Sequence, residues 1–158
     1  MPVKPIPDGY SAVTPYITVR NAAAAIEFYT KAFGAEQTLR LDSPDGKVAH
    51  AEIRIGGSVI MLSEEEPKWG ALSPETVGGT PCSIMLYVKD ADAVFKRAVD
   101  AGATVTMEMA DQFYGDRCGG IKDPFGHKWS IATHIEDVPP DEIGRRAAKK
   151  FEEMAKSG

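Results

Sequence analysis

Val13-Thr14-Pro15-Tyr16-Ile17-Thr18-Val19-Arg20-Asn21-Ala22 decides the fold, because Cys82-Ser83-Ile84-Met85-Leu86-Tyr87-Val88-Lys89-Asp90-Ala91 repeats its pattern at an offset of 69 residues (82 − 13). Both stretches alternate like a β-strand for seven residues, then carry a basic residue, Asn or Asp, and an Ala-rich helical pattern. The helices that follow both end at a Gly-Ala pair, 34–35 and 102–103. A self-match over half the chain indicates two copies of one module.

Each copy has the order β-α-β-β-β. In the first copy, Asn21 is expected to cap a helix that ends at Gly34, and Gly56-Gly57 is expected to close a β-hairpin. In the second copy, Asp90 takes the capping position, and Asp123-Pro124-Phe125-Gly126 joins the last two strands. A helix must cover one face of each sheet, which leaves the other face free.

These patterns predict an α+β fold of two βαβββ modules that form a curved mixed sheet around a cleft, with a C-terminal helix. We expect one domain over 1–158, divided into module one at about 10–63, a linker at 64–81, module two at 82–134 and a helical tail at 139–158. The tail carries apolar residues on one side, so we expect it to dock on the body or on a partner subunit. A cleft between repeats is a default ligand site.

Composition excludes several classes of protein. A net charge of −5 and a pI of about 5.2 argue against a nucleic-acid partner and against an anionic membrane surface. The cysteines, Cys82 and Cys118, fit no metal spacing and are too few for a disulfide framework. Without an N-terminal apolar run or a stretch of about 20 apolar residues, we expect a cytoplasmic protein.

Strand alternation assigns side chains to the cleft face. A two-residue turn at Gly56-Gly57 sets Glu52 opposite Met61, so that these residues and His50 face the cleft. With a four-residue turn in module two, Arg117 lies opposite Ala132 and also points into the cleft. The remaining residues expected to line the cleft are Thr14, Tyr16, Ser83, Tyr87 and Ser130.

At this point the sequence resembles the vicinal oxygen chelate superfamily, which includes glyoxalases, bleomycin resistance proteins and dihydroxybiphenyl dioxygenases. The resemblance is carried by the repeat, by Ile26-Glu27-Phe28-Tyr29-Thr30-Lys31-Ala32-Phe33-Gly34 and by Asp123-Pro124-Phe125-Gly126-His127-Lys128-Trp129. His50-Ala51-Glu52 and Asp111-Gln112-Phe113-Tyr114-Gly115-Asp116-Arg117 look most like its PhnB-like branch. The resemblance implies the paired βαβββ fold.

The resemblance also locates the metal ligands of the family's enzymes, which are His, Glu or Gln. Those positions correspond here to Thr14, Met61, Ser83 and Ser130. None is a good ligand for Zn, Ni, Fe or Mn. We therefore predict no cofactor and no metal at the usual site.

The other candidates are polar residues near the predicted cleft. His50 and Glu52 are expected to act as a base or as a hydrogen-bonding pair, since a carboxylate inside a cleft needs a partner. Asp116 and Arg117 could hold a carboxylate or phosphate of a ligand, or Arg117 could form an internal ion pair, for example with Glu52. Tyr114 is placed in a loop at the cleft rim.

We predict a glyoxalase/bleomycin-resistance-like protein that binds a small organic molecule without a metal, and the resemblance implies a homodimer. The catalytic or charged residues would be His50, Glu52 and Arg117. The alternative is a metal-dependent lyase, isomerase or dioxygenase with shifted ligands around His50 and Glu52. A third hypothesis is an interaction module whose active part is the tail.

Overall fold

The computed structural model describes residues 2–158. Its first module follows the predicted β-α-β-β-β order. Its elements are β1 (Tyr16–Val19), α1 (Ala22–Phe33), β2 (Glu36–Asp42), β3 (Val48–Ile55) and β4 (Ser58–Glu64). The predicted ends of α1 are confirmed: Asn21 Oδ1 accepts the N–H of Ala24 at 3.2 Å, and Gly34 leaves the helix at φ 68°. A positive φ there is easily adopted only by glycine.

The second module repeats this order. Its elements are β5 (Ser83–Tyr87), α3 (Ala91–Asp100), β6 (Thr104–Asp111), β7 (Asp116–Lys122) and β8 (Lys128–His134). Asp90 caps α3 as predicted, because its Oδ1 accepts the N–H of Ala93 at 3.0 Å. The α+β fold of two βαβββ modules is therefore confirmed.

The strands form two separate four-stranded sheets, in the orders β1-β4-β3-β2 and β5-β8-β7-β6. In each sheet the first strand runs parallel to the last strand of its module, and the other pairs are antiparallel. The hairpin register predicted from Gly56-Gly57 is confirmed, with Glu52 opposite Met61 and Ile55 opposite Ser58.

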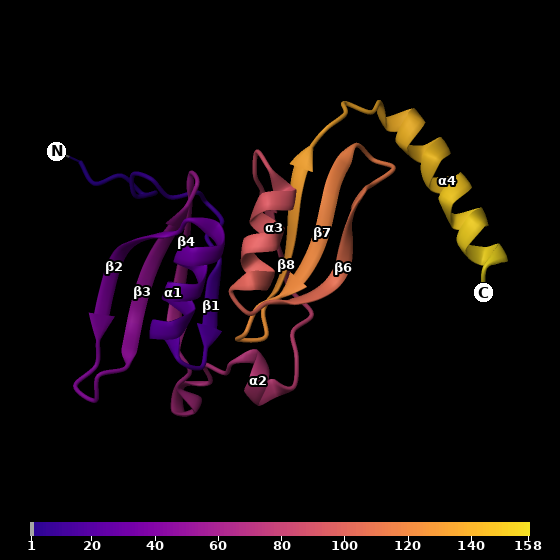
Figure 1. Cartoon of the computed structure of the whole chain (residues 1–158). Coiled ribbons are helices and arrows are strands. Elements are labelled where there is room, and N and C mark those ends of the chain that lie inside the picture. Colours follow the sequence, from indigo (N-terminus) through magenta and orange to yellow (C-terminus); the bar gives the residue numbers. More distant parts are fainter. Residues whose placement is uncertain (1) are drawn as a thin grey trace.

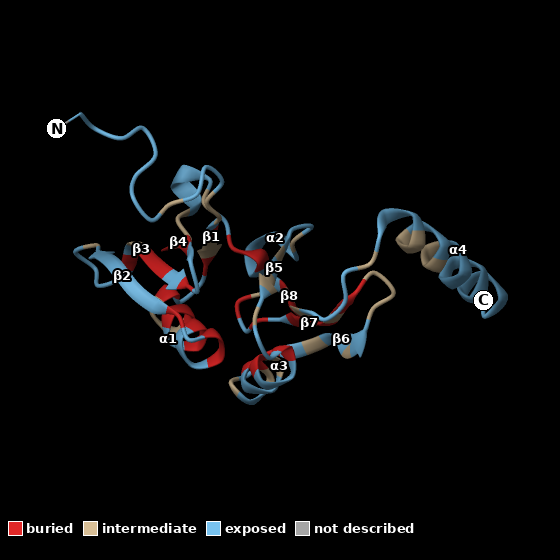
Figure 2. Ribbon diagram, turned by 90° about the horizontal axis from the view of Figure 1, so that it is seen from above, coloured by how far each residue is buried: buried red, intermediate tan, exposed pale blue. Residues whose placement is uncertain are grey.

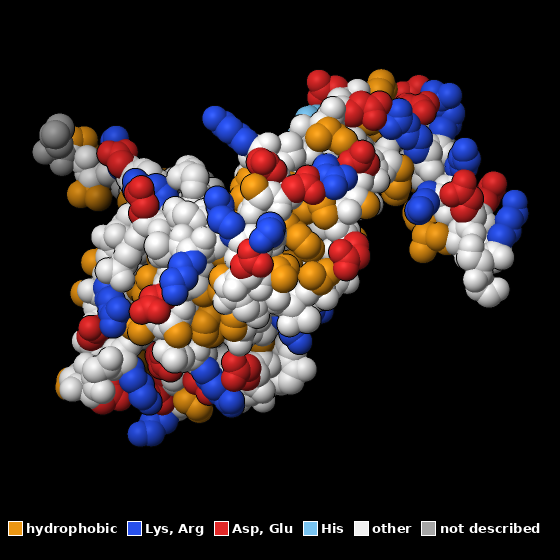
Figure 3. Space-filling view, in the orientation of Figure 1, with side chains coloured by type: hydrophobic (Ala, Val, Ile, Leu, Met, Phe, Trp, Pro, Cys, Tyr) orange, Lys and Arg blue, Asp and Glu red, His pale blue; other side chains and the backbone are white. Residues whose placement is uncertain are grey.

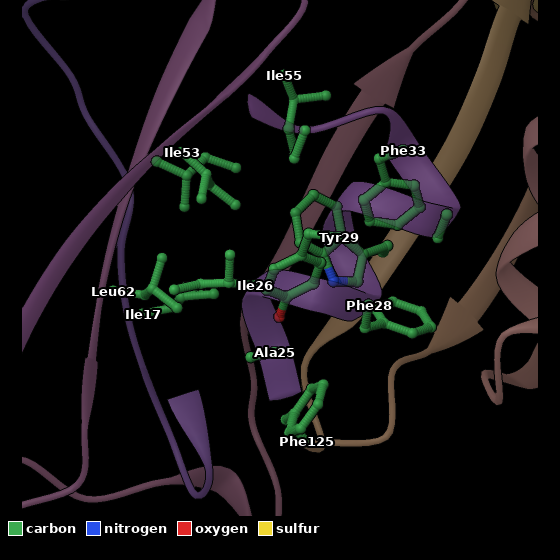
Figure 4. Packing of buried hydrophobic residues seen from close by; sticks show 14 of the residues in the cluster. Ile17, Ala25, Ile26, Phe28, Tyr29, Phe33, Ile53, Ile55, Leu62 and Phe125 are labelled. Atoms are coloured by element: carbon green, nitrogen blue, oxygen red, sulfur yellow. The ribbon is translucent and has the colours of Figure 1, made fainter. Parts of the chain in front are cut away.

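The two modules meet through their helices. Figure 2 shows α1 and α3 on the same side of the two sheets, which leaves the opposite face of each sheet open. Aromatic rings of α1 cross the boundary: the Phe33 ring lies 4.7 Å from the Trp129 ring, and Phe28 meets Phe125 edge to face. On its other side α1 packs against Ile53 and Leu62 of the first sheet (Figure 4). One hydrophobic core therefore spans both modules.

The segment between the modules contains two short helices, η1 (Pro67–Trp69) and α2 (Pro74–Val77). The tail forms α4 (Pro140–Lys156), which projects away from the body (Figures 1 and 3). The first turns of α4 are held by Arg146, which binds Glu136 and the carbonyl of Phe113. Phe151 and Met154 are exposed. Across residues 2–158, no helix has the length and apolar character that a bilayer span requires.

Candidate functional site

A chain of hydrogen bonds crosses the open face of module one. The alternation of β3 directs His50 and Glu52 to the face opposite α1, as predicted. The Tyr16 hydroxyl lies 2.9 Å from His50 Nδ1, and His50 Nε2 lies 3.2 Å from Glu52 Oε1. Tyr10, on the N-terminal arm, donates its hydroxyl to the other oxygen of Glu52.

Glu52 is the buried end of this chain, with only 7% of its surface exposed. The hydrogen bond from Tyr10, together with the bond to His50, holds the pKa of Glu52 below its usual value although burial opposes this. Glu52 therefore carries a negative charge at neutral pH. That charge fixes the His50 ring, which in turn orients the Tyr16 hydroxyl.

A second polar chain crosses the open face of module two. Tyr87 donates its hydroxyl to Asp116 Oδ2 at 2.7 Å, and His134 Nδ1 lies 2.8 Å from Asp116 Oδ1. His134 Nε2 lies 2.9 Å from Asp137. Burial raises the pKa of Asp116, but the hydrogen bonds from Tyr87 and His134 outweigh burial, so this pKa lies below its usual value. The two carboxylates raise the pKa of His134.

Arg117 does not belong to this face, which corrects the prediction. The turn after β7 contains five residues and is closed by the N–H of Asp123 on the carbonyl of His127, so the register differs by one residue from the expected one. Arg117 therefore pairs with Thr133 and lies on the helix side. There it forms ion pairs with Asp92 of α3 at 2.7 Å and with Asp111 at 3.0 Å. An internal ion pair is formed, but not with Glu52.

Two hollows adjoin the open faces. A groove of about 960 Å³ lies between the modules, and Tyr87 and His134 are among the residues that line it. A pocket of about 660 Å³ lies on module one and includes Tyr16. Of the predicted cleft residues, Tyr87 lines the groove and Tyr16 lines the pocket. The predicted positions outside both linings are Thr14, His50, Glu52, Met61, Ser83, Tyr114, Asp116, Arg117 and Ser130.

The residues at the family's metal positions do not fit a metal ion. Thr14 and the two serines offer hydroxyls and Met61 a thioether, and the Thr14 hydroxyl is already donated to the carbonyl of Ser11. Within residues 2–158, no three His, Cys, Asp or Glu side chains are grouped so that they could hold a metal. His50 and Glu52 thus have no third protein ligand beside them.

Sequence reasoning missed three residues of these surfaces. His134 is not among the predicted cleft residues, although the correct register places it opposite Asp116. Tyr10 lies in an arm with no periodic pattern, so no signal connected it to Glu52. Trp69 lies in a linker whose charges suggest a solvated loop, yet its ring lines the module-one pocket.

Known proteins resemble this chain both in sequence and in fold. A protein of Mycobacterium tuberculosis that has no assigned function is 46% identical over 135 residues, covering 84% of this chain and 79% of that protein. The crystal structure of TioX from Micromonospora sp. ML1 superposes with a TM-score of 0.64 at 25% identity, covering 79% of this chain and 99% of TioX. A PhnB protein from Bacillus cereus shares the fold, with a TM-score of 0.60 at 15% identity over 78% of this chain and 99% of that chain.

The family assignment rests on most of the chain. The model of the Glyoxalase/Bleomycin resistance protein/Dioxygenase superfamily matches residues 11–131, which include both modules up to the middle of β8. The paired βαβββ modules described above provide the same arrangement in three dimensions. The chain therefore belongs to the glyoxalase/bleomycin resistance protein/dioxygenase superfamily.

Proposed function

We propose that this protein binds a small organic molecule in the groove between its modules, without a metal at the family's usual positions. The observation that carries this proposal is the groove itself, whose volume of about 960 Å³ suits a drug-sized ligand. One wall is the hairpin tip of module one, residues 55–60, and the other is β5 with the neighbouring surface of α3. A ligand in this groove contacts both halves of the repeat.

The chemistry of the walls favours a largely apolar ligand with a polar group at one end. Met85, Leu86 and Val88 supply apolar surface, and the Tyr87 hydroxyl and His134 supply polar contacts. Asp116 holds both polar groups in place. Preorganised polar groups in an apolar groove give orientation and specificity.

A matched pair of variants tests the groove. Met85 lines it and is 46% exposed, whereas Met107 is 41% exposed on β6 and lies outside it. A library of small organic molecules is first screened by thermal shift. For a confirmed ligand, Met85→Lys should weaken binding at least tenfold, since it places a charge in an apolar wall, and Met107→Lys should leave binding unchanged. Equal effects of the two substitutions would reject the groove as the site.

An enzyme that uses His50 and Glu52 is the second candidate, because the Tyr16-His50-Glu52 chain resembles an oriented acid–base pair. Glu52→Gln separates the two functions. An enzyme acting on a vicinal dioxygen substrate should lose turnover by orders of magnitude. A protein that only binds a ligand in the groove should keep its affinity, because Glu52 does not line the groove.

Three further properties belong to the proposal. We place the chain in the PhnB-like branch, and the likeness to the PhnB protein from Bacillus cereus supports this choice only through the shared fold. We also propose a homodimer located in the cytoplasm. Light scattering of the purified protein should give twice the chain mass of 17.0 kDa, and a mass of one chain would contradict the dimer.

A further inference from the structure

The pocket on module one is separate from the groove, because no residue lines both hollows. It has a volume of about 660 Å³. It lies between β1, the C-terminal end of β4, the turn that joins β2 to β3, and the segment that contains η1. The residues that line it are Tyr16, Thr18, Ser43, Pro44, Asp45, Lys47, Val48, Ala49, Ser63, Glu64, Glu65, Glu66, Trp69 and Ala71.

Two aromatic rings line this pocket, those of Tyr16 and Trp69. Trp69 is 86% exposed, and among residues 2–158 no other aromatic ring packs on it. Its backbone is nevertheless fixed, because Glu66 and Ala71 exchange two backbone hydrogen bonds around it. Tyr16 is fixed through its hydroxyl by His50. Large exposed aromatic surface on a constrained segment marks a contact site for a ligand.

The charges around these rings are mainly negative. Four carboxylates line the pocket and only one cation, Lys47, does so. Two of the carboxylates are committed to the fold: Glu64 accepts the backbone N–H groups of Asn21 and Ala22, and Glu65 binds Arg20. Glu66 forms no ion pair with any of residues 2–158, and its side chain accepts only the N–H of Lys68.

We propose that this pocket binds a planar organic cation. Its ring would stack on Trp69 and Tyr16, because aromatic faces attract both flat rings and positive charge. Its charge would lie near Glu66, which lacks a cationic partner, and near Asp45, whose contact with Lys47 is a long 4.0 Å. This site is additional to the ligand groove between the modules and does not depend on it.

Tryptophan fluorescence provides a direct measurement. The chain has two tryptophans, and Trp129 is only 1% exposed, so a ligand that reaches the pocket changes mainly the emission of Trp69. The probes are 1-methylquinolinium, neutral quinoline at pH 8 and the 2-naphthoate anion, which have similar flat shapes and different charges. Isothermal titration calorimetry repeats each titration without depending on fluorescence.

We expect 1-methylquinolinium to bind at least tenfold more tightly than 2-naphthoate, with quinoline between them, and to bind more weakly as salt is added. Trp69→Ala should weaken its binding about tenfold. Glu66→Gln should weaken it several-fold while keeping an oxygen that can accept the N–H of Lys68. The matched controls are Phe151→Ala, an exposed aromatic on α4, and Glu108→Gln, an exposed carboxylate on β6; neither should change binding.

The proposal fails if the cation and the anion bind equally, or if Trp69→Ala binds 1-methylquinolinium as tightly as the unchanged protein. It also fails if Phe151→Ala or Glu108→Gln weakens binding as much as the pocket variants do. Met85→Lys, which tests the groove, should leave 1-methylquinolinium binding intact. Loss of groove binding with retention of this site therefore separates the two proposals.

Discussion

At the scale of single residues, Asp123 links the two modules through its hydrogen bonds. It is 2% exposed and accepts four hydrogen bonds, from the Tyr29 hydroxyl at 2.6 Å, Trp129 Nε1 at 2.9 Å and the backbone N–H groups of Phe125 and His127. Tyr29 belongs to module one and the other donors to module two. A single carboxylate therefore satisfies polar groups on both sides of the module boundary.

Asp123→Asn should lower the free energy of unfolding by about 3 kcal/mol or more, because the amide nitrogen cannot accept and leaves buried donors unpaired. Tyr29→Phe should cost only about 1 kcal/mol, because it removes one donor and leaves three in place. Urea unfolding monitored by circular dichroism measures both values. Equal costs for the two substitutions would contradict this account of Asp123.

The lowered pKa of Glu65 should make the stability of the fold depend on pH. Hydrogen bonds from the Thr76 hydroxyl, the Ser73 backbone and Arg20 lower the pKa of Glu65 from 4.5 to about 2. A carboxyl whose pKa is lower in the folded state stabilises fully above its unfolded pKa, and this contribution disappears as pH falls toward the folded value. Urea midpoints of the natural chain should therefore fall between about pH 4.5 and pH 2 more steeply than those of Glu65→Gln. Parallel curves for the two proteins would contradict the assignment.

The residue scale also shows what the sequence could not reveal. Asp123 is a common turn residue, and nothing in its neighbours indicates contact with a tyrosine 94 positions earlier. His50 and Glu52 were correctly placed side by side, since strand alternation and a two-residue turn determine their face. Their partner Tyr10 was not foreseen, because an irregular arm has no periodicity from which its path can be inferred.

At the scale of elements, turn length separates the correct register from the wrong one. Gly56-Gly57 allows one tight hairpin, so the pairing of β3 with β4 was predicted residue by residue. Asp123-Pro124-Phe125-Gly126 is compatible with a loop of four or five residues, and the fifth residue reverses the face of every side chain on β7. That one-residue difference moved Arg117 from the cleft face to the helix side.

Gly119 on β7 makes room for α3. A Cβ atom at this position would lie 2.8 Å from the Phe95 ring, which is closer than such contacts occur. Gly119→Ala should therefore cost about 1–3 kcal/mol through overpacking. Combining it with Phe95→Leu should recover part of that cost, which a double-mutant cycle of urea unfolding would measure.

Gly144→Ala, on α4, serves as the control for the Gly119→Ala substitution. Nothing lies within 4 Å of a Cβ at position 144, so alanine there should be neutral or slightly stabilising. Additive effects of Gly119→Ala and Phe95→Leu would show that the ring does not require the glycine.

At the scale of the whole molecule, the two modules should unfold together. Their sheets are not hydrogen bonded to each other, but α1 packs its aromatic rings against the turn and β8 of module two. Trp69→Phe leaves Trp129, which is 1% exposed in the shared core, as the single fluorescent reporter of unfolding. The urea transition of Trp129 emission should coincide with the circular dichroism transition of the same protein.

Phe125→Ala should lower the midpoints of both probes together by removing a ring from that core, at a cost of about 3–5 kcal/mol. Separate transitions, or a shift of only one probe, would mean that each module has its own core. The sequence predicted the two modules through their repeat. It did not predict that they meet through helices, since amphipathic patterns show which side of a helix is buried and not what covers it.

The turn that carries Asp123 and Phe125 has a consequence for how such a chain can be rebuilt. Module one has Gly56-Gly57 at the corresponding place, and these two residues carry neither a carboxylate nor a ring, so the two halves are complementary parts rather than interchangeable duplicates. A gene fusing two copies of module one would lack the carboxylate for Tyr29 and the ring for Phe28. A circular permutant that starts at module two keeps both contacts, so the order of the halves can be exchanged although neither half can replace the other.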